Sequence, residues 1–123
     1  MFGGRGNSEE ESRPSRPGHY KGKHFTEYVD TVKSLKREGR LGEAERLLLG
    51  LIDVMEEEER QDGYGVAPWY YEQVAIICRK QQRCADEVAV LERFAEQRKG
   101  PGAKVPKLLE RLKKARELLA RQQ

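Results

Sequence analysis

The chain is poor in the residues that cross-link small domains. Cysteine and histidine each occur only twice among 123 residues. Small secreted domains that depend on disulfides carry four or more cysteines, so a disulfide framework is excluded. The N-terminal residues, MFGGRGNSEEES, also lack the apolar stretch of a secretory signal. We therefore expect a reduced protein in the cytoplasm.

Long hydrophobic runs are absent as well. A helix that spans a bilayer needs about 20 consecutive, mostly apolar residues. No stretch of this sequence has that character, because charged residues interrupt every apolar segment. We therefore expect no association with a membrane.

Catalytic signatures are missing too. The sequence has no glycine-rich phosphate loop and no nucleophilic serine between glycines, and neither His19 nor His24 lies beside a plausible nucleophile. Four consecutive carboxylates, Glu56–Glu59, lack the alternating Asp, Asn and Gly residues of a calcium loop. We expect a protein that is not an enzyme and that binds neither a cofactor nor a metal.

Charged residues, in contrast, are abundant. Asp, Glu, Lys and Arg make up 37% of the chain, and hydrophobic residues another 37%. This balance is typical of helices with one apolar and one charged face. Residues 24–98 hold eleven Lys and Arg against sixteen Asp and Glu, whereas residues 99–123 hold eight against two. An acidic body is thus followed by a basic C-terminal segment.

Two regions are expected, a disordered arm over residues 1–22 and a helical domain over residues 23–123. The arm is rich in Gly, Pro and Ser, and it has little apolar surface with which to offset the entropy of ordering. Its SRPSRPG stretch is basic, but a disordered tail remains the favoured interpretation.

Five amphipathic segments follow the arm, each with apolar residues three and four apart. Their apolar faces comprise Phe25, Tyr28, Val29, Val32 and Leu35; Leu41, Ala44, Leu47, Leu48, Leu51, Ile52 and Met55; Trp69, Tyr71, Val74, Ala75, Ile77 and Cys78; Val88, Leu91, Phe94 and Ala95; and Leu108, Leu109, Leu112, Ala115, Leu118 and Leu119. The pattern predicts an all-α fold of two antiparallel helical hairpins and one capping helix.

Local signals give the expected helix ends. Thr26 is expected to cap the first helix and Gly39 to end it, while Pro68 and Pro106 are expected to begin the third and fifth. The Glu56–Glu59 run is expected to carry the second helix into solvent and to fray.

Gly50 lies in the middle of the second helix. A glycine there costs roughly 1 kcal/mol relative to alanine. We interpret Gly50 as a point where another segment approaches the helix closely.

The second hairpin partly repeats the first, and the turn within Leu35–Leu51 is the better preserved of two related turns. The matching positions lie 43 residues apart up to the turn and 44 after it. They pair Tyr28 with Tyr71, Val32 with Ala75, Leu35 with Cys78, Leu41 with Cys84, Ala44 with Val88, and Leu51 with Ala95.

The segment GRLGEAERLL (Gly39–Leu48) resembles the tetratricopeptide repeat family. Its Gly39, Leu41 and Ala44 look like the glycine, large apolar residue and alanine of that family's turn and second helix. The resemblance covers roughly residues 24–98, with a spacing longer than the family's 34 residues. It implies stacked helical hairpins and a non-catalytic adaptor function in protein–protein interaction.

In this family the first helices of each pair line a concave face that binds peptides or partner helices. Carried onto this chain, that face includes Thr26 and Ile76 together with the partner-binding candidates Lys33, Lys36, Arg37, Tyr70, Arg79 and Lys80. Because the candidates are mostly basic, we expect an acidic peptide or a terminal carboxylate as the partner.

Self-association remains open as another mode of interaction. Trp69, Tyr70 and Tyr71 are consecutive, and they are candidates for an exposed aromatic patch through which copies of the chain dimerise.

Nucleic-acid binding is the alternative function, and it rests on the C-terminal helix. Its candidates for nonspecific phosphate contacts, with the N-terminal arm, are Lys107, Arg111, Lys113, Lys114 and Arg121. No aromatic residue lies between these charges, so a protein partner is favoured.

Cys78 and Cys84 lie on apolar faces. Their spacing matches no tight cysteine pair of a zinc site, even with His19 and His24 considered as further ligands. We interpret both cysteines as buried free thiols.

Overall fold

The structure is a computed structural model that describes residues 16–123. Most of this range is helical, as the sequence predicts, and a short β-hairpin precedes the helices. In chain order the elements are β1 (His19–Tyr20), β2 (Lys23–His24), the 3-10 helix η1 (Phe25–Tyr28), α2 (Val29–Arg37), α3 (Leu41–Asp62), α4 (Pro68–Lys80), α5 (Cys84–Ala95) and α6 (Lys104–Gln122). No helix in the described range is both long enough and apolar enough to cross a bilayer.

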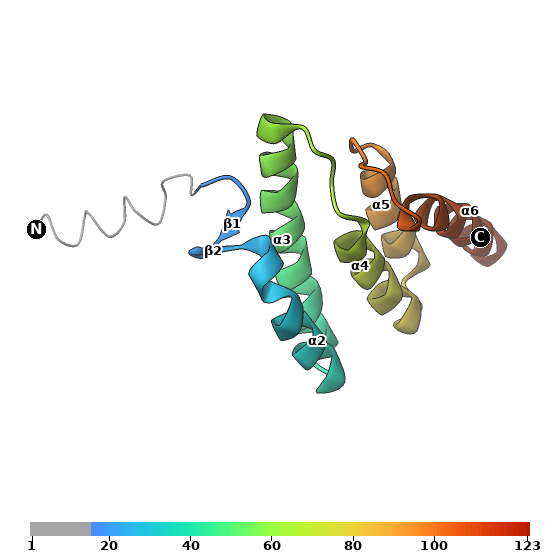
Figure 1. Ribbon diagram of the computed structural model, residues 1–123. Helices are drawn as coiled ribbons and strands as arrows, with labels where there is room; N and C mark the ends of the chain where they lie inside the picture. The colour runs from blue at the N-terminus through green and yellow to red at the C-terminus, as the bar shows by residue number, and fades with distance from the viewer. Residues whose placement is uncertain (1–15) are drawn as a thin grey trace, which may run out of the picture.

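Each helix packs against the next one in sequence, so the chain forms a row of helices (Figure 1). α3 lies between the N-terminal elements and α4, and α6 packs on both α4 and α5. The predicted apolar faces supply most of the buried core, which also takes in Val66 and Val90. Leu109 is an exception, because 39% of its surface is exposed on the outer side of α6.

The turns after α2 and α4 have the same backbone geometry. Gly39 has a φ of +76° and Gln82 has a φ of +58°, both in the left-handed region. In each turn the next residue's N–H reaches five residues back, from Arg40 to the carbonyl of Leu35 at 2.9 Å and from Arg83 to that of Cys78 at 2.8 Å. The correspondence of the two turns in sequence therefore extends to their conformation.

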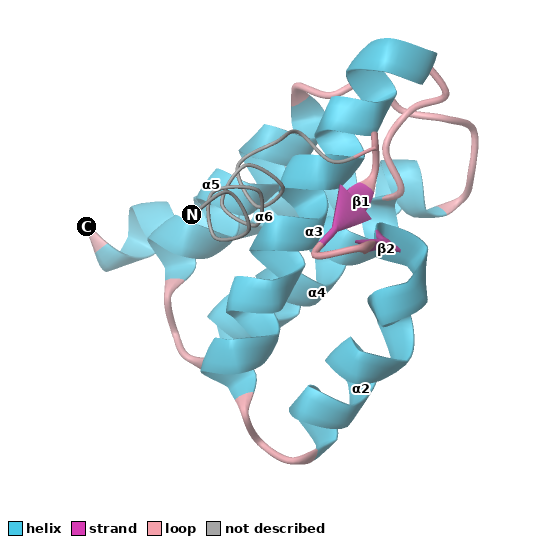
Figure 2. Ribbon diagram, turned by 90° about the vertical axis from the view of Figure 1, so that its left-hand side faces the viewer, coloured by secondary structure: helices cyan, strands magenta, loops and turns pink. Residues whose placement is uncertain are grey.

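The N-terminal end of the domain begins earlier than predicted. Residues 16–22 were expected to belong to a disordered arm, but they form a turn and most of a β-hairpin against α3 (Figure 2). The Tyr28 hydroxyl donates to the carbonyl of Tyr20, and the Tyr20 ring lies over Gly50 of α3. The rest of the predicted arm, residues 1–15, lies outside the described residues.

His24, and not Thr26, caps the first helical segment. The His24 ring accepts from the Thr26 N–H at 3.3 Å, and the Glu27 carboxylate accepts from the His24 N–H at 3.3 Å, which completes a capping box. The other ring nitrogen of His24 lies 2.8 Å from the Glu58 carboxylate of α3. Because histidine is not among the residues usually found at helix N-caps, the sequence predicted Thr26 as the cap instead.

The acidic end of α3 is exposed only in part, since Glu57 and residues 60–62 are exposed whereas Glu56 is buried. The helix continues to Asp62 and ends at Gly63, which has a φ of +75°. Glu56 is buried. The Tyr71 hydroxyl donates to its carboxylate at 2.7 Å, and the Arg93 guanidinium donates to it at 2.8 and 2.9 Å. The Arg93 guanidinium balances the negative charge of Glu56, and these hydrogen bonds hold this part of the helix in place.

Helix α6 begins at Lys104, two residues before the predicted start at Pro106. Proline is tolerated in the first turn of a helix, where its missing N–H would have no partner within the helix. Pro106 therefore lies just inside the helix and does not mark its first residue.

Candidate functional site

A hollow of about 300 Å³ lies between α2 and α4. Its basic side is one turn of α2, which supplies Lys33, Lys36 and Arg37, and its other side is formed by Trp69 and Gln73 of α4. Residues three and four apart on a helix share one face, so the spacing of the three basic residues places their side chains together. Three of the six predicted partner-binding residues are thus brought to one place.

Lys36 joins the two sides of the hollow. It is half-buried, and its ammonium donates to Oε1 of Gln73. Burial lowers the pKa of Lys36, and repulsion from Lys80 lowers it further, while Glu72 acts in the opposite direction. Lys36 therefore carries its positive charge in surroundings that disfavour it.

The basic residues in and beside the hollow form no ion pairs within the described range, as is also true of Lys107, Lys113 and Lys114 on α6. Lys33, Lys36, Arg37 and Lys80 make no ion pair with a residue of the described range. Elsewhere in that range carboxylates pair with Arg40, Arg60, Arg79, Arg83, Arg93, Arg98, Lys104, Arg111 and Arg116. Glu72 is the carboxylate that raises the pKa of Lys36, and it pairs with Lys104 at 2.9 Å. No carboxylate of the described residues therefore pairs directly with the basic side chains of the hollow, and Glu72 acts on Lys36 only from a longer distance.

Two predicted site residues, Tyr70 and Arg79, are engaged in contacts within the fold. Only 4% of the Tyr70 surface is exposed, because its ring packs edge-on against Phe25 at 5.3 Å and against Trp69 at 4.9 Å. Arg79 holds the fully buried Glu87 by two hydrogen bonds, of 2.6 and 2.9 Å. Both residues thus contribute to the packing of α4, and neither lines the hollow; that they bind a partner stays a prediction.

The predicted exposed aromatic patch is not formed either. Tyr70 and Tyr71 are buried, and Tyr71 packs against Phe94 with ring centroids 5.2 Å apart. Trp69 alone keeps part of its ring at the surface, where it lines the hollow. Of these three consecutive residues, only Trp69 is thus left for a contact with another copy of the chain.

The nucleic-acid candidates on α6 are divided by their contacts. Arg111 donates to Glu87 at 2.9 Å, so it ties α6 to α5. Lys107, Lys113 and Lys114 are exposed, and within residues 16–123 no carboxylate pairs with them. Glu110 and Glu117 are exposed on the same helix, so the outer face of α6 has mixed charge.

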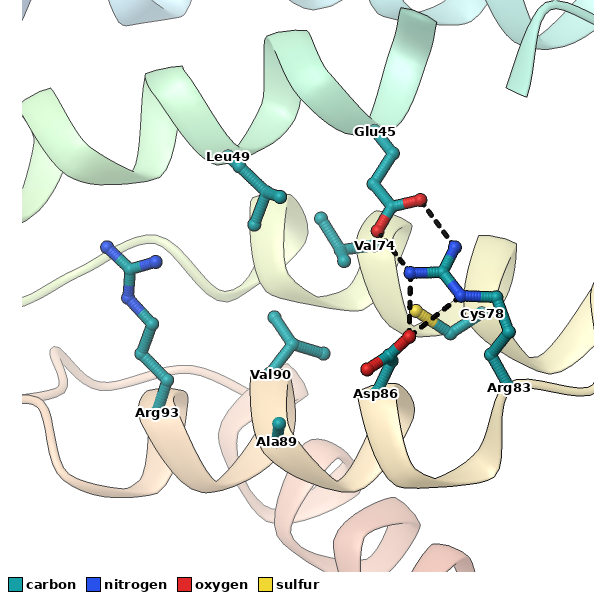
Figure 3. A pocket seen from close by; sticks show the side chains of 9 residues that line it. All are labelled: Glu45, Leu49, Val74, Cys78, Arg83, Asp86, Ala89, Val90 and Arg93. Carbon is teal, nitrogen blue, oxygen red and sulfur yellow. Dashed lines mark hydrogen bonds and ion pairs between the residues drawn. The ribbon is translucent and has the colours of Figure 1, made fainter. Parts of the chain in front are cut away.

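A second hollow, of about 310 Å³, lies between α3 and α5 over α4 (Figure 3). Leu49, Val74 and Val90 form much of its wall. At one end Arg83 donates to Glu45 at 2.7 and 2.9 Å and pairs with Asp86 at 2.8 Å. At the other end Arg93 pairs with Asp53 and Glu56. The charged groups around this hollow are already satisfied, so it offers little to a charged ligand.

The two cysteines are free and buried, as the sequence predicts. Cys78 lines the second hollow, and burial raises the pKa of its thiol to about 11. A thiol with so high a pKa is a poor nucleophile at neutral pH. In the described part of the chain no group of three or more His, Cys, Asp and Glu side chains is placed to hold a metal ion.

Sequence reasoning missed the roles of Trp69 and Gln73 in the first hollow. Trp69 was assigned to the core of the third helix and to the aromatic patch, and Gln73 was not singled out. The signal was present in the spacing, because Trp69 and Gln73 are four residues apart and therefore share a face of α4. Comparisons of the chain with protein-family models, with curated proteins and with solved structures found no match.

Proposed function

We propose that this chain is a non-catalytic protein–protein interaction module that binds an acidic peptide segment in the hollow between α2 and α4. The observation that carries the proposal is the positive charge around Lys36, which is half-buried, repelled by Lys80 and not paired with a carboxylate of the described residues. An anion bound there relieves the repulsion and supplies acceptors for the Lys and Arg donors.

The repeated hairpins support a tetratricopeptide-like arrangement for this module. In that arrangement α2 and α4 are the first helices of two successive pairs, and their shared face is the binding face. The matching turn conformations at Gly39 and Gln82 favour it, as does the packing of each helix on the next. The two free buried cysteines are compatible with a reducing location such as the cytoplasm.

The test uses the single tryptophan of the chain, Trp69, as a reporter within the hollow. Trp69 fluorescence is followed while a short Gly/Ser peptide with two adjacent glutamates is added. The double variant Lys36→Glu/Arg37→Glu reverses two charges in the hollow, and Lys113→Glu/Lys114→Glu makes the same change of net charge on α6. Circular dichroism checks that both variants are folded.

We expect the α2 double variant to lose at least about tenfold in affinity, a change of about 1.4 kcal/mol in binding free energy. The α6 double variant should stay within about twofold of the unchanged chain. If the α6 variant loses binding and the α2 variant keeps it, the proposal is wrong and α6 is the binding element. The neutral variant Lys36→Met repeats the test without the addition of a negative charge.

A further inference from the structure

The donors of the hollow are concentrated on one helical turn. Lys33, Lys36 and Arg37 lie within five consecutive residues of α2, and Lys80 is close enough to repel Lys36. The Cβ atoms of residues three or four apart on a helix are about 5–6 Å from one another. The hollow therefore offers several positive charges to one small anion and has no extended row of separate sites.

A single carboxylate is a poor match for this concentration of charge. It brings one negative charge and two oxygens, which one guanidinium can take up by a bidentate pair. Lys33 and Lys36 would then remain unbalanced, and the repulsion between Lys36 and Lys80 would persist. A phosphoryl group carries a charge of about −1.5 to −2 at neutral pH and three acceptor oxygens, so it serves all three α2 donors at once.

The Arg37 side chain is already held in place for such a ligand. Its Nη2 donates to Oγ of Ser34 at 3.0 Å. A guanidinium has five N–H donors in a fixed fork, so donors remain available after this bond forms. Trp69, on the opposite side of the hollow, offers a ring face against which a neighbouring part of a ligand can pack.

We propose that the ligand of this hollow is a phosphorylated side chain within a peptide, held by Lys33, Lys36 and Arg37 beside Trp69. This inference rests on the proposed function, since it specifies the chemistry of the peptide that the same hollow binds. A nucleic-acid backbone fits less well, because successive phosphates need cations along a track and these cations gather at one point. The hollow also has one aromatic ring, whereas single-stranded nucleic acids stack on several.

The test compares three peptides of otherwise identical Gly/Ser sequence, in which the centre is phosphoserine, two adjacent glutamates or unmodified serine. The first two have nearly the same charge and differ in its geometry. Trp69 fluorescence is the readout for each peptide, and for inorganic phosphate and a short oligouridine. We expect the phosphoserine peptide to bind about tenfold more tightly than the glutamate peptide, and the serine peptide to give no response.

A matched variant isolates the role of the guanidinium fork. Arg37→Lys keeps the charge and removes the bidentate geometry. Because a guanidinium pairs bidentately with a carboxylate as well as with a phosphoryl group, we expect Arg37→Lys to weaken both peptides, the phosphoserine peptide by about fivefold or more. An unchanged affinity for the phosphoserine peptide would contradict the role of Arg37.

The outcomes separate this inference from the proposed function. Equal affinity for the phosphoserine and glutamate peptides overturns the phosphoryl ligand and leaves the acidic-peptide module intact. No response to either peptide overturns both proposals. Inorganic phosphate or oligouridine that binds as tightly as the phosphopeptide also overturns the inference, in favour of a bare anion site or a nucleic-acid site.

Discussion

At the scale of single residues, Lys36 is expected to favour binding at the expense of stability. Its charge is held in a half-buried place, beside Lys80 and without a carboxylate partner in the described range. Such an arrangement costs folding free energy and is retained where a ligand uses it. The same residue should therefore weaken the fold and create the site.

The first prediction follows from this opposition. Lys36→Met keeps most of the side-chain volume and removes the charge, so it should raise the free energy of unfolding by about 0.5 kcal/mol while it weakens binding of the acidic peptide. Urea denaturation measures the first effect and Trp69 fluorescence the second. Lys33→Met removes an exposed charge in the same hollow and should change stability little; a loss of stability in Lys36→Met would contradict the account.

The second prediction concerns stability at alkaline pH. Burial raises the pKa of Tyr70 to about 12 and that of Cys78 to about 11, above their ordinary values of 10.0 and 9.0. The folded state binds the protons of Tyr70 and Cys78 more tightly than the unfolded state does. The resulting contribution to the free energy of unfolding is complete below the ordinary pKa values and is lost as the pH rises through the raised pKa values. Unfolding free energy should fall between about pH 9 and 12.

A matched pair of variants tests the part played by Tyr70. Tyr70→Phe removes the buried hydroxyl, and it should recover on the order of 2 kcal/mol of the alkaline loss. Tyr64→Phe, which removes an exposed hydroxyl, serves as the control. Parallel pH profiles for Tyr70→Phe and the unchanged chain would show that Tyr70 does not contribute.

At the scale of elements, the repeated turn gives the third prediction. Gln82 adopts the left-handed conformation that Gly39 adopts in the first turn, with a φ of +58°. A residue with a side chain is strained there, by about 1 kcal/mol. Gln82→Gly should therefore raise the free energy of unfolding by about 1 kcal/mol.

The neighbouring glutamine provides the control for this turn. Gln81 has a φ of −94°, which is normal for a residue with a side chain. Glycine there relieves no strain, and it increases the conformational entropy of the unfolded chain. Gln81→Gly should lower stability by about 0.5 kcal/mol. If thermal denaturation shows both variants to be destabilised equally, the two turns do not share the strained position.

The fourth prediction concerns the contact between the N-terminal hairpin and α3. A Cβ on Gly50 would lie 2.5 Å from Cε1 of Tyr20, whereas one on Gly42 would meet only the end of Arg46 at 3.7 Å. Alanine usually stabilises a helix interior relative to glycine. Gly42→Ala should therefore gain up to about 1 kcal/mol, and Gly50→Ala should lose about as much because the hairpin must move.

Proteolysis and chemical denaturation together check this pair. The hairpin of Gly50→Ala should become more sensitive to protease near Lys21 and Lys23, and that of Gly42→Ala should not. Stabilisation by both substitutions would mean that the hairpin does not pack on α3 as the structure has it.

Most of the element pattern was predictable because it depends on local spacing. Apolar residues three and four apart identified the faces of all the α-helices, and Gly39 and Pro68 marked ends that the structure confirms. Gly50 was correctly read as a point of close approach, but the approaching residue, Tyr20, belonged to a segment that was assigned to the disordered arm. Its apolar contacts lie with α3, some thirty residues away, and composition alone does not reveal them.

At the scale of the whole molecule, the charges were harder to assign. Glu87 is fully buried and joins Arg79 of α4 to Arg111 of α6, although its type and spacing suggest an exposed helix face. A carboxylate can be buried only where its partners converge, and which arginines converge depends on helix packing. Arg79 and Arg111, which the sequence offered as binding candidates, thus also hold helices together through Glu87.

The hollow is a smaller candidate site than the face predicted from the sequence. Neither Tyr70 nor Arg79 lines the hollow, so its basic side consists of Lys33, Lys36 and Arg37 of α2, with Lys80 nearby. The helix before the first turn was predicted to carry the binding chemistry, and the hollow contains its three basic residues. That these three residues bind a partner stays a prediction.

The most direct test locates the bound peptide by nuclear magnetic resonance. The 15N-labelled chain is titrated with the acidic peptide, and shifts are mapped for backbone amides and for the indole N–H of Trp69. The account predicts that the largest changes fall on Lys33, Lys36, Arg37, Trp69 and Gln73, the residues that line the hollow. Changes confined to α6, or spread evenly over the surface, would contradict it.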